Sequence, residues 1–261
     1  MDSNFAEKFK KAVTANFNQS KDHYLRLEEK YGFFLKLTDA LLAEIQPFAD
    51  WQDKTIDILD VGCGTGSSVA RLQKAFPSAQ VVGLDISGKM LEAARTAFPE
   101  VKFVQGDGEY LSQYFSAGSF DLVVYPASLF IMPNQEKSLQ GAKQILKPDG
   151  AVAASVLLGL KEQNQQALEN LPAFKGIIKN DELPQLFAQY FHNVTSTELN
   201  IPLNRAMADT IYHIEALSAG AFPGKPYPER VQALNELLDE VDSKQAQLVQ
   251  KWLLVAGYMK K

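Results

Sequence analysis

Cysteine, histidine and long apolar runs are scarce in this sequence of 261 residues. Cys63 is the single cysteine, which excludes an internal disulfide and a cysteine-based zinc site and fits a reducing compartment. No stretch approaches the roughly 18 apolar residues of a transmembrane helix. No apolar run follows a basic start at the amino terminus, as a secretory signal would require. We therefore expect a cytoplasmic protein without a membrane partner.

Clusters of positive charge are also missing. The chain has 26 basic and 31 acidic residues, a formal net charge of −5, and no run of lysine and arginine. Affinity for nucleic acids comes largely from clustered cations that neutralise phosphates, so the composition argues against a nucleic-acid partner. The three histidines form no motif such as His-x-x-x-His, and we predict no metal site.

The most informative stretch, residues 57–72, has the pattern of a strand, a glycine turn and a helix. A short apolar run suits a buried strand, and apolar residues then recur at helical spacing. Between them stand three glycines, which let the backbone turn sharply and let a ligand approach it closely: Gly62, Gly64 and Gly66. Ser67 and Ser68 are predicted to cap the helix. The stretch therefore predicts a ligand cradle at the start of a helix.

An acid after the next strand narrows the choice of ligand. Residues 80–84 have the pattern of a second buried strand, and Asp85 follows the glycines by roughly the 20 residues typical of a ribose-binding acid. Nicotinamide and adenosyl cofactors both use such an acid. A dinucleotide fingerprint is G-x-G-x-x-G, whereas here the third glycine is Gly66 and the next residue is Ser67, which favours an adenosyl cofactor.

The segment from Asp60 to Gly66, Asp-Val-Gly-Cys-Gly-Thr-Gly, resembles the first motif of the class I S-adenosylmethionine-dependent methyltransferases. The resemblance implies S-adenosyl-L-methionine as the cofactor. It implies that the cofactor is held by the turn and by the acid after the second strand, that is, by Gly62, Cys63, Gly64, Gly66 and Asp85. Cys63 could also be interpreted as a nucleophile, but a small residue is needed at its position in either case.

The same resemblance assigns further cofactor contacts. It implies that Ile86 and Met90 flank the adenine, although ordinary helix core explains Met90 equally well. It also implies an acid beside the adenine amino group, and Asp107, with Gly108, follows the third strand at the matching place. A carboxylate only accepts hydrogen bonds and that amine donates them, so the chemistry agrees, although a plain turn could also use Gly-Asp-Gly.

Two tyrosines complete the candidate cofactor site. The segment that ends at Tyr24 resembles the amino-terminal helix of small-molecule methyltransferases such as the O-methyltransferase of biotin synthesis, in which a tyrosine closes over the cofactor. Plain packing is the alternative for this residue. Tyr125 ends the fourth strand, residues 120–125, at the edge where ligands of parallel sheets bind. No Asn/Asp-Pro-Pro-Tyr sequence follows, which disfavours a nucleic acid or a protein as the acceptor.

The fold implied by the resemblance is α/β, a Rossmann-like, seven-stranded, mostly parallel sheet with helices on both faces and a helical cap. We expect one compact unit with an amino-terminal helical lid segment (1–50), an S-adenosylmethionine-binding core (51–160) and a part that completes the sheet and carries the cap insertion (161–261). Residues 161–190 are predicted to be mostly helical. Residues 252–258 suit a strand or a helix by periodicity, and fold analogy favours the last strand.

The chemistry implied is methyl transfer from an already activated sulfonium, for which positioning of the acceptor is the main task. A base is needed only when the acceptor must lose a proton. His213, in the expected cap helix, is the candidate catalytic base. His192 is assigned a structural role, and His23 lies next to Tyr24, near the expected cleft.

The sequence favours a small, partly apolar methyl acceptor, because aromatic residues crowd the amino-terminal segment and residues 222–227. These aromatics could equally form the outer core of the sheet. A nicotinamide-dependent oxidoreductase and a non-catalytic S-adenosylmethionine-binding protein are the alternative functions. The sequence indicates neither the acceptor, nor the atom that is methylated, nor the oligomeric state.

Overall fold

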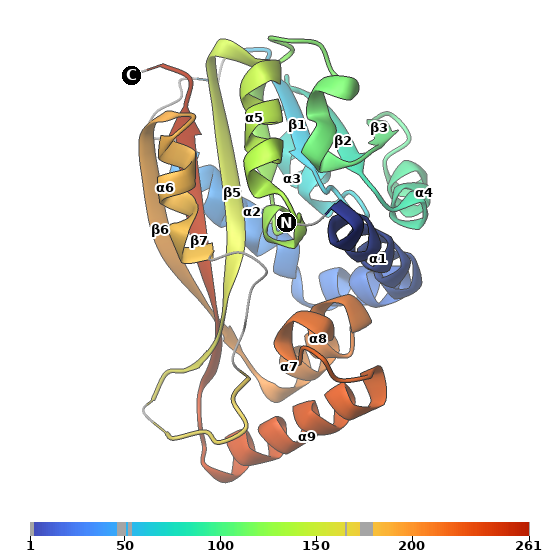
Figure 1. Cartoon of the computed structure of the whole chain (residues 1–261), viewed down its shortest axis with the longest axis vertical. Helices are drawn as coiled ribbons and strands as arrows, with labels where there is room; N and C mark the ends of the chain where they lie inside the picture. Colours follow the sequence, from blue (N-terminus) through green and yellow to red (C-terminus); the bar gives the residue numbers. More distant parts are fainter. Residues whose placement is uncertain (1–2, 46–50, 52–53, 165, 173–179, 261) are drawn as a thin grey trace.

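The computed structural model of the chain describes residues 3–45, 51, 54–164, 166–172 and 180–260. Its centre is a seven-stranded sheet with the strand order β3-β2-β1-β4-β5-β7-β6 (Figure 1). The strands are β1 (Asp57–Val61), β2 (Gln80–Asp85), β3 (Lys102–Gln105), β4 (Phe120–Tyr125), β5 (Leu146–Glu162), β6 (His192–Leu203) and β7 (Leu248–Tyr258). Strands β1 to β5 are parallel, and β7 runs antiparallel to both of its neighbours. The predicted seven-stranded, mostly parallel sheet is confirmed.

Helices cover both faces of this sheet and one of its ends. The α-helices are α1 (Ser3–Tyr31), α2 (Phe33–Ile45), α3 (Ser67–Ala75), α4 (Gly88–Ala97), α5 (Gln135–Ile145), α6 (Leu183–Ala188), α7 (Arg205–Tyr212), α8 (Glu215–Ala221) and α9 (Tyr227–Ser243). Short 3-10 turns are η2 (Gly108–Gln113), η3 (Leu129–Ile131) and η4 (Asn180–Glu182). No helix in the described part of the chain combines the length and the apolar composition needed to cross a membrane.

Alternate residues of the central strands supply two separate cores. On β1, Ile58 packs into the cluster formed with α2, α3 and α4, whereas Leu59 and Val61 pack into the cluster formed with α5 and α6. Successive side chains of a strand point to opposite faces, and both faces of a parallel sheet are covered, which explains why Ile58, Leu59 and Val61 are all apolar. The carboxyl ends of the strands are thereby held in fixed positions at one edge.

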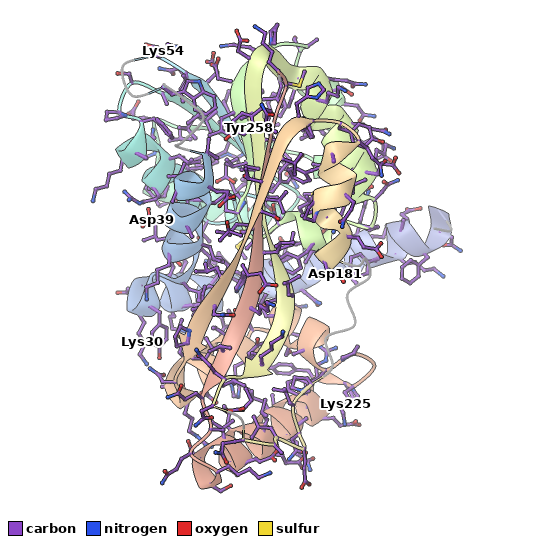
Figure 2. All side chains as sticks on the ribbon, turned by 90° about the vertical axis from the view of Figure 1, so that its left-hand side faces the viewer. Lys30, Asp39, Lys54, Asp181, Lys225 and Tyr258 are labelled. Carbon is purple, nitrogen blue, oxygen red and sulfur yellow. The ribbon has the colours of Figure 1, made fainter. Side chains whose placement is uncertain are left out.

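The long outer strands extend the sheet beyond its parallel part and carry a cap. Ala154 is the last β5 residue paired with β4, but β5 continues against β7 to Glu162. Figure 2 shows these strands running from the end marked by Tyr258 to the helices near Lys225. Helices α7 to α9 lie between β6 and β7 in the sequence and form a third core with α1, α2 and the far halves of the strands. The cap insertion between the last two strands is confirmed.

Several local expectations were wrong. The described residues between 161 and 190 are not mostly helical, because β5 runs to Glu162 and the described remainder is helical only from η4 onward. Strand β7 covers residues 252–258, so the strand assignment there is correct. Gly66, rather than a serine, is the residue that precedes α3, and no side chain caps that helix. Ser68 instead donates a hydrogen bond to Asp60.

Candidate functional site

The three glycines after β1 have positive φ angles but serve two different purposes. A Cβ atom at Gly62 would collide with Ser128, and one at Gly66 would lie 2.8 Å from the Phe98 ring. A Cβ at Gly64 would meet no atom within 4 Å. Gly62 and Gly66 are therefore required by the packing of the turn on its neighbours, whereas Gly64 turns an open backbone towards the cavity that it lines.

Asp85 closes the turn from the end of β2. Its carboxylate accepts N–H groups from Gly64, at 2.8 Å, and from Ser87, at 2.7 Å. Burial raises its pKa, while these main-chain hydrogen bonds oppose the rise. A carboxylate at this place is held rigidly between the glycine turn and the start of α4, at the rim of the cavity.

Asp60, one residue before the end of β1, is fully buried. Ser68 donates a hydrogen bond to its Oδ2, but Oδ1 has no hydrogen-bond partner among the described residues. Burial raises the pKa of Asp60 to about 7, against the lowering effect of the Ser68 hydroxyl, and the charge of Asp85 adds to the rise. A proton or a cation beside this buried, unpartnered oxygen would stabilise it.

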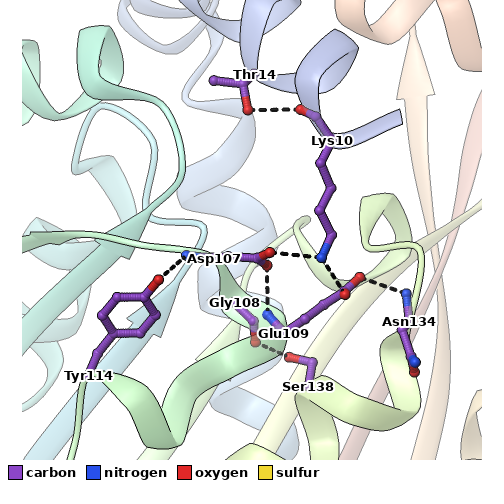
Figure 3. Close-up of polar contacts among 8 residues, drawn as sticks. All are labelled: Lys10, Thr14, Asp107, Gly108, Glu109, Tyr114, Asn134 and Ser138. Carbon is purple, nitrogen blue, oxygen red and sulfur yellow. Dashed lines mark hydrogen bonds and ion pairs between the residues drawn. The ribbon is translucent and has the colours of Figure 1, made fainter. Parts of the chain in front are cut away.

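A cluster of ion pairs joins α1 to the end of β3 (Figure 3). Lys10 Nζ donates to Asp107 Oδ2 at 2.7 Å and also to Glu109 Oε2. The Asn134 main-chain N–H donates to the other Glu109 oxygen at 2.7 Å. Burial of Lys10 acts to lower its pKa, but the hydrogen bonds to the two carboxylates outweigh it and raise the pKa. Lys10 is thus a charged tie between the first helix and the strand ends.

A second tie fixes α1 to the start of α4. Asn18 Oδ1 accepts a hydrogen bond from the Ser87 hydroxyl at 2.7 Å and from the Lys89 N–H at 3.3 Å. The Ser87 oxygen itself accepts the Met90 N–H and so caps α4. Helix α1 therefore lies across the ends of β2 and β3, held at residues two turns apart.

Aromatic side chains lead from α1 into the cap. Each ring centroid lies between 5.3 and 6.1 Å from the next, in the order Phe17, Tyr24, Phe34, Phe33, Trp252 and Phe130. All six line one cavity of about 1100 Å³ that also includes the glycine turn and the ends of β2 and β3. The cavity therefore has a polar part at the strand ends and an aromatic part, here called the cap chamber, between α1, α2 and the cap.

Comparison with known proteins points to the same region. Residues 58–150 match a family model described as a methyltransferase domain. A trans-aconitate 2-methyltransferase of Enterobacter sp. strain 638 is 31% identical over 163 residues, which are 62% of this chain and 62% of that protein. The enzyme of the same name from Deinococcus radiodurans is 40% identical over 52% of this chain and 48% of its own length. The chain thus spans 62% and 48% of the lengths of these two curated relatives.

Solved structures share the fold at lower identity. The YcgJ protein of Bacillus subtilis has a TM-score of 0.56 at 17% identity, with 85% of this chain and 99% of that chain covered. The phosphoethanolamine N-methyltransferase 2 of Haemonchus contortus, solved with S-adenosyl-L-methionine, has a TM-score of 0.54 at 16% identity, with 85% and 53% covered.

Residues 58–150 are a methyltransferase domain, and the comparisons support a class I S-adenosylmethionine-dependent methyltransferase.

Most of the cofactor contacts predicted for this methyltransferase come together around one cavity. The predicted residues that line it are Tyr24, Gly62, Cys63, Gly64, Asp85, Ile86, Met90, Asp107 and Gly108. Gly66 does not line it, because its place in the turn serves packing against α4. Burial raises the pKa of the Cys63 thiol, so the thiol stays protonated and does not suit a nucleophile.

Two predicted methyltransferase residues point elsewhere. Tyr125 is fully buried on the α5 side of the sheet, with its hydroxyl 2.9 Å from the Ser138 oxygen. His213 ends α7, and its Nδ1 lies 2.9 Å from the Asp209 carbonyl oxygen; it is absent from the described cavity lining, whereas the preceding Tyr212 belongs to it. The described cavity lining therefore holds Tyr212 instead of His213, since neighbouring side chains of a helix point about 100° apart, and the catalytic role of His213 stays a prediction.

Several residues of the methyltransferase cavity gave no signal in the sequence. Lys10 and Glu109 are charged residues without a recognisable motif, and Gln250 lies in a strand predicted only from residue 252. Alternation along β7 would have placed Gln250 and Trp252 on the same face. Among the described residues, no group of three or more His, Cys, Asp or Glu side chains could hold a metal ion.

Proposed function

We propose that this protein transfers a methyl group from S-adenosyl-L-methionine to a small, partly apolar acceptor. The observation that carries the proposal is the continuity of the cavity, which joins the Asp85 carboxylate and the open backbone at Gly64 to the cap chamber. A donor and an acceptor can lie end to end in such a space, one at the strand ends and one beneath the cap.

The polar part of the cavity fits the cofactor. Asp85 would accept hydrogen bonds from the ribose hydroxyls, and Asp107 would accept one from the adenine amino group. The backbone at Gly64 leaves room where a side chain would stand. The unpartnered Oδ1 of Asp60 lies beneath the same turn and favours the positive charge that this cofactor carries.

Apolar and aromatic contacts complete this assignment. Ile86 and Met90 would flank the adenine, and Tyr24 would close over the other end of the cofactor. Gly62, Cys63 and Gly66 would shape the turn, two of them through close packing. Tyr125 would act only from the sheet core, by supporting the strand end.

The cofactor supplies a methyl group bonded to a positively charged sulfur, which an electron pair of the acceptor can displace without a metal or a protein nucleophile. The protein holds the acceptor in line and excludes water, and orientation of this kind can lower a barrier by roughly 7 to 11 kcal/mol. Residues of helix α1 and of the cap line the cavity together with the strand ends. No histidine is found in the described cavity lining. An acceptor that is already ionised fits this lining, because it needs no base.

Trans-aconitate is one candidate acceptor, because the relatives with partial coverage carry that substrate in their names. A cytoplasmic location and a small-molecule partner stay predictions from composition and cavity shape. The nicotinamide alternative is disfavoured by the position of the third glycine, which serves packing of α4 rather than a pyrophosphate turn.

The test has two stages. Calorimetry with S-adenosylmethionine and with nicotinamide dinucleotides should give binding of the first alone. Labelled methyl groups should then pass into the low-molecular-weight fraction of a size-fractionated cell extract. Binding of a nicotinamide cofactor instead would contradict the proposal, and label in the protein or nucleic-acid fraction would contradict the small acceptor. Tight S-adenosylmethionine binding with no transfer to any fraction would favour the non-catalytic alternative.

A further inference from the structure

Three side chains in the cap chamber form a hydrogen-bond chain. Trp252 Nε1 lies 3.1 Å from Gln250 Oε1, and Gln250 Nε2 lies 2.5 Å from the Tyr212 hydroxyl oxygen. All three residues are at most 3% exposed, and all three line the cavity. Trp252 joins this group to the aromatic row of the cavity, because Phe33 and Phe130 both pack on its ring.

This hydrogen-bond chain allows one consistent arrangement of protons. An indole N–H can only donate, so Gln250 turns its amide oxygen towards Trp252 and its amide nitrogen towards Tyr212. The Tyr212 oxygen accepts from that nitrogen, and its own O–H proton has to point in another direction. No acceptor for this proton is found among the residues that the structure describes. Burial raises the pKa of Tyr212, so the proton stays on the hydroxyl at neutral pH.

We infer that Tyr212 determines acceptor specificity, its hydroxyl donating a hydrogen bond to a carbonyl or carboxylate oxygen of an acceptor with an apolar body. Gln250 and Trp252 are positioning residues that aim this donor. The inference rests on the proposed function and names the acceptor class for the same cavity. A buried donor without a partner is costly, and an acceptor oxygen would remove that cost. A ligand that lacks such an oxygen would leave this energetic cost in place.

The expectation that the acceptor has an apolar body follows from the lining of the cap chamber. Six aromatic rings surround the space between α1, α2 and β7. The charges around the described lining do not suit a ligand with several negative charges. Its carboxylates are Asp85, Asp107, Glu109, Asp181 and Glu198, and its cations are Lys10, Lys161, Arg230 and Lys251. Lys10 and Lys251 already form ion pairs with lining carboxylates. We therefore expect an acceptor with a single oxygen-bearing group in preference to a tricarboxylate.

The test measures ligand affinity by calorimetry on the full chain saturated with S-adenosylhomocysteine, which occupies the donor site without allowing transfer. Four probes are compared: 3-phenylpropanoate, 3-phenylpropanamide, propylbenzene and trans-aconitate. Y212F should weaken the acid and the amide about tenfold, the loss of roughly one hydrogen bond, and leave propylbenzene unchanged. The acid and the amide separate a carboxylate from a neutral carbonyl as the preferred oxygen.

W252F tests the aim of the donor while Tyr212 stays in place. Without the indole N–H, the Gln250 amide can turn over and accept the Tyr212 proton, so selectivity for the acid and the amide over propylbenzene should fall. Y227F is the matched control, because the Tyr227 hydroxyl lies in the cap but donates to the His213 carbonyl oxygen at 2.8 Å. It should change the affinity of no probe.

Unchanged acid and amide affinities in Y212F would overturn the inference, as would tighter binding of trans-aconitate than of 3-phenylpropanoate, or no binding of any probe. These outcomes leave the proposed function intact if S-adenosylhomocysteine still binds and methyl transfer to extract persists. Loss of S-adenosylhomocysteine binding by the unaltered protein would instead contradict the proposed function itself.

Discussion

Lys10 and Asp107 are 97 residues apart in the sequence, yet the lysine ammonium lies 2.7 Å from the aspartate carboxylate. Glu109, which is 4% exposed, shares the same ammonium. This arrangement makes the first helix part of the wall of the cofactor region. It also means that opening the cavity at α1 requires two carboxylates to lose their cation.

We predict that K10M loosens α1 without unfolding the sheet. Loss of hydrogen bonds to charged groups should lower the free energy of unfolding by about 1 to 3 kcal/mol. Amide hydrogen exchange should become faster in α1 and stay slow in β1 and β4. K11M is the matched control, since Lys11 makes an exposed ion pair with Glu7. Equal exchange rates in the two variants would show that the Lys10 cluster does not hold the helix.

Asp85 should be needed for cofactor affinity. We expect D85A to weaken S-adenosylhomocysteine binding by about 1.5 to 3 kcal/mol for each charged hydrogen bond lost, as measured by calorimetry. D121A is the control, because Asp121 also accepts a main-chain N–H, from Asp57 at 2.8 Å, but lies at the opposite end of the strands. D121A should lose stability and keep its affinity. A D85A protein with full affinity would contradict the ribose assignment.

Gly64 should tolerate a methyl group in the free protein but not in the complex. Gly64 and Gly118 have similar positive φ angles, 54° and 66°, and at both a Cβ would meet no atom within 4 Å. G64A and G118A should therefore lose similar stability, roughly 1 kcal/mol from backbone strain. Only G64A should lose cofactor affinity, by at least tenfold in calorimetry. Equal affinities would mean that the cofactor does not lie against this turn.

Stability should depend on pH through Asp60. Its pKa is about 7 in the folded protein, owing mainly to burial, against an ordinary value of 3.8. Between these values the folded chain holds a proton that the unfolded chain releases. The contribution of Asp60 to the free energy of unfolding therefore falls as pH rises from about 4 to about 7. It stays at its lower level above that range.

D60N, which resembles the protonated side chain, should remove this dependence. Urea unfolding at pH 5 and pH 8 should show that the difference between D60N and the unaltered protein shifts in favour of D60N at the higher pH. S68A should extend the window upwards, because the Ser68 hydroxyl lowers the pKa of Asp60. A difference that is constant across this pH range would show that Asp60 is ionised throughout.

The parallel half of the fold and its ligand turn could be predicted because their causes are local. The period of the apolar residues changes at Gly62, and Asp85 ends a short buried run. Tyr125 was misplaced for a related reason. When both faces of a strand are buried, periodicity does not say which face a large side chain occupies. Its position at the strand end was right, and its direction was not.

Contacts between distant segments could not be predicted. Neither the position of Lys10 over Asp107 nor the extension of β5 to Glu162 is specified by neighbouring residues. The outer half of β5 is held by β7, and such pairing overrides local propensity. The break between α7 and α8 falls at His213 and Ile214, inside a segment with continuous helical spacing. Tyr212 therefore lines the chamber where the sequence had indicated His213.

The Cα atoms of Leu203 and Leu248 are paired in the β6–β7 ladder, so the cap leaves and rejoins the sheet at adjacent points. An insertion whose ends meet can be lengthened, shortened or replaced while the strand register stays the same. The glycine turn and Asp85 lie outside it, and Tyr212 lies within it. Donor binding and acceptor choice can therefore diverge independently during evolution, and two homologues that share the glycine motif need not share a substrate.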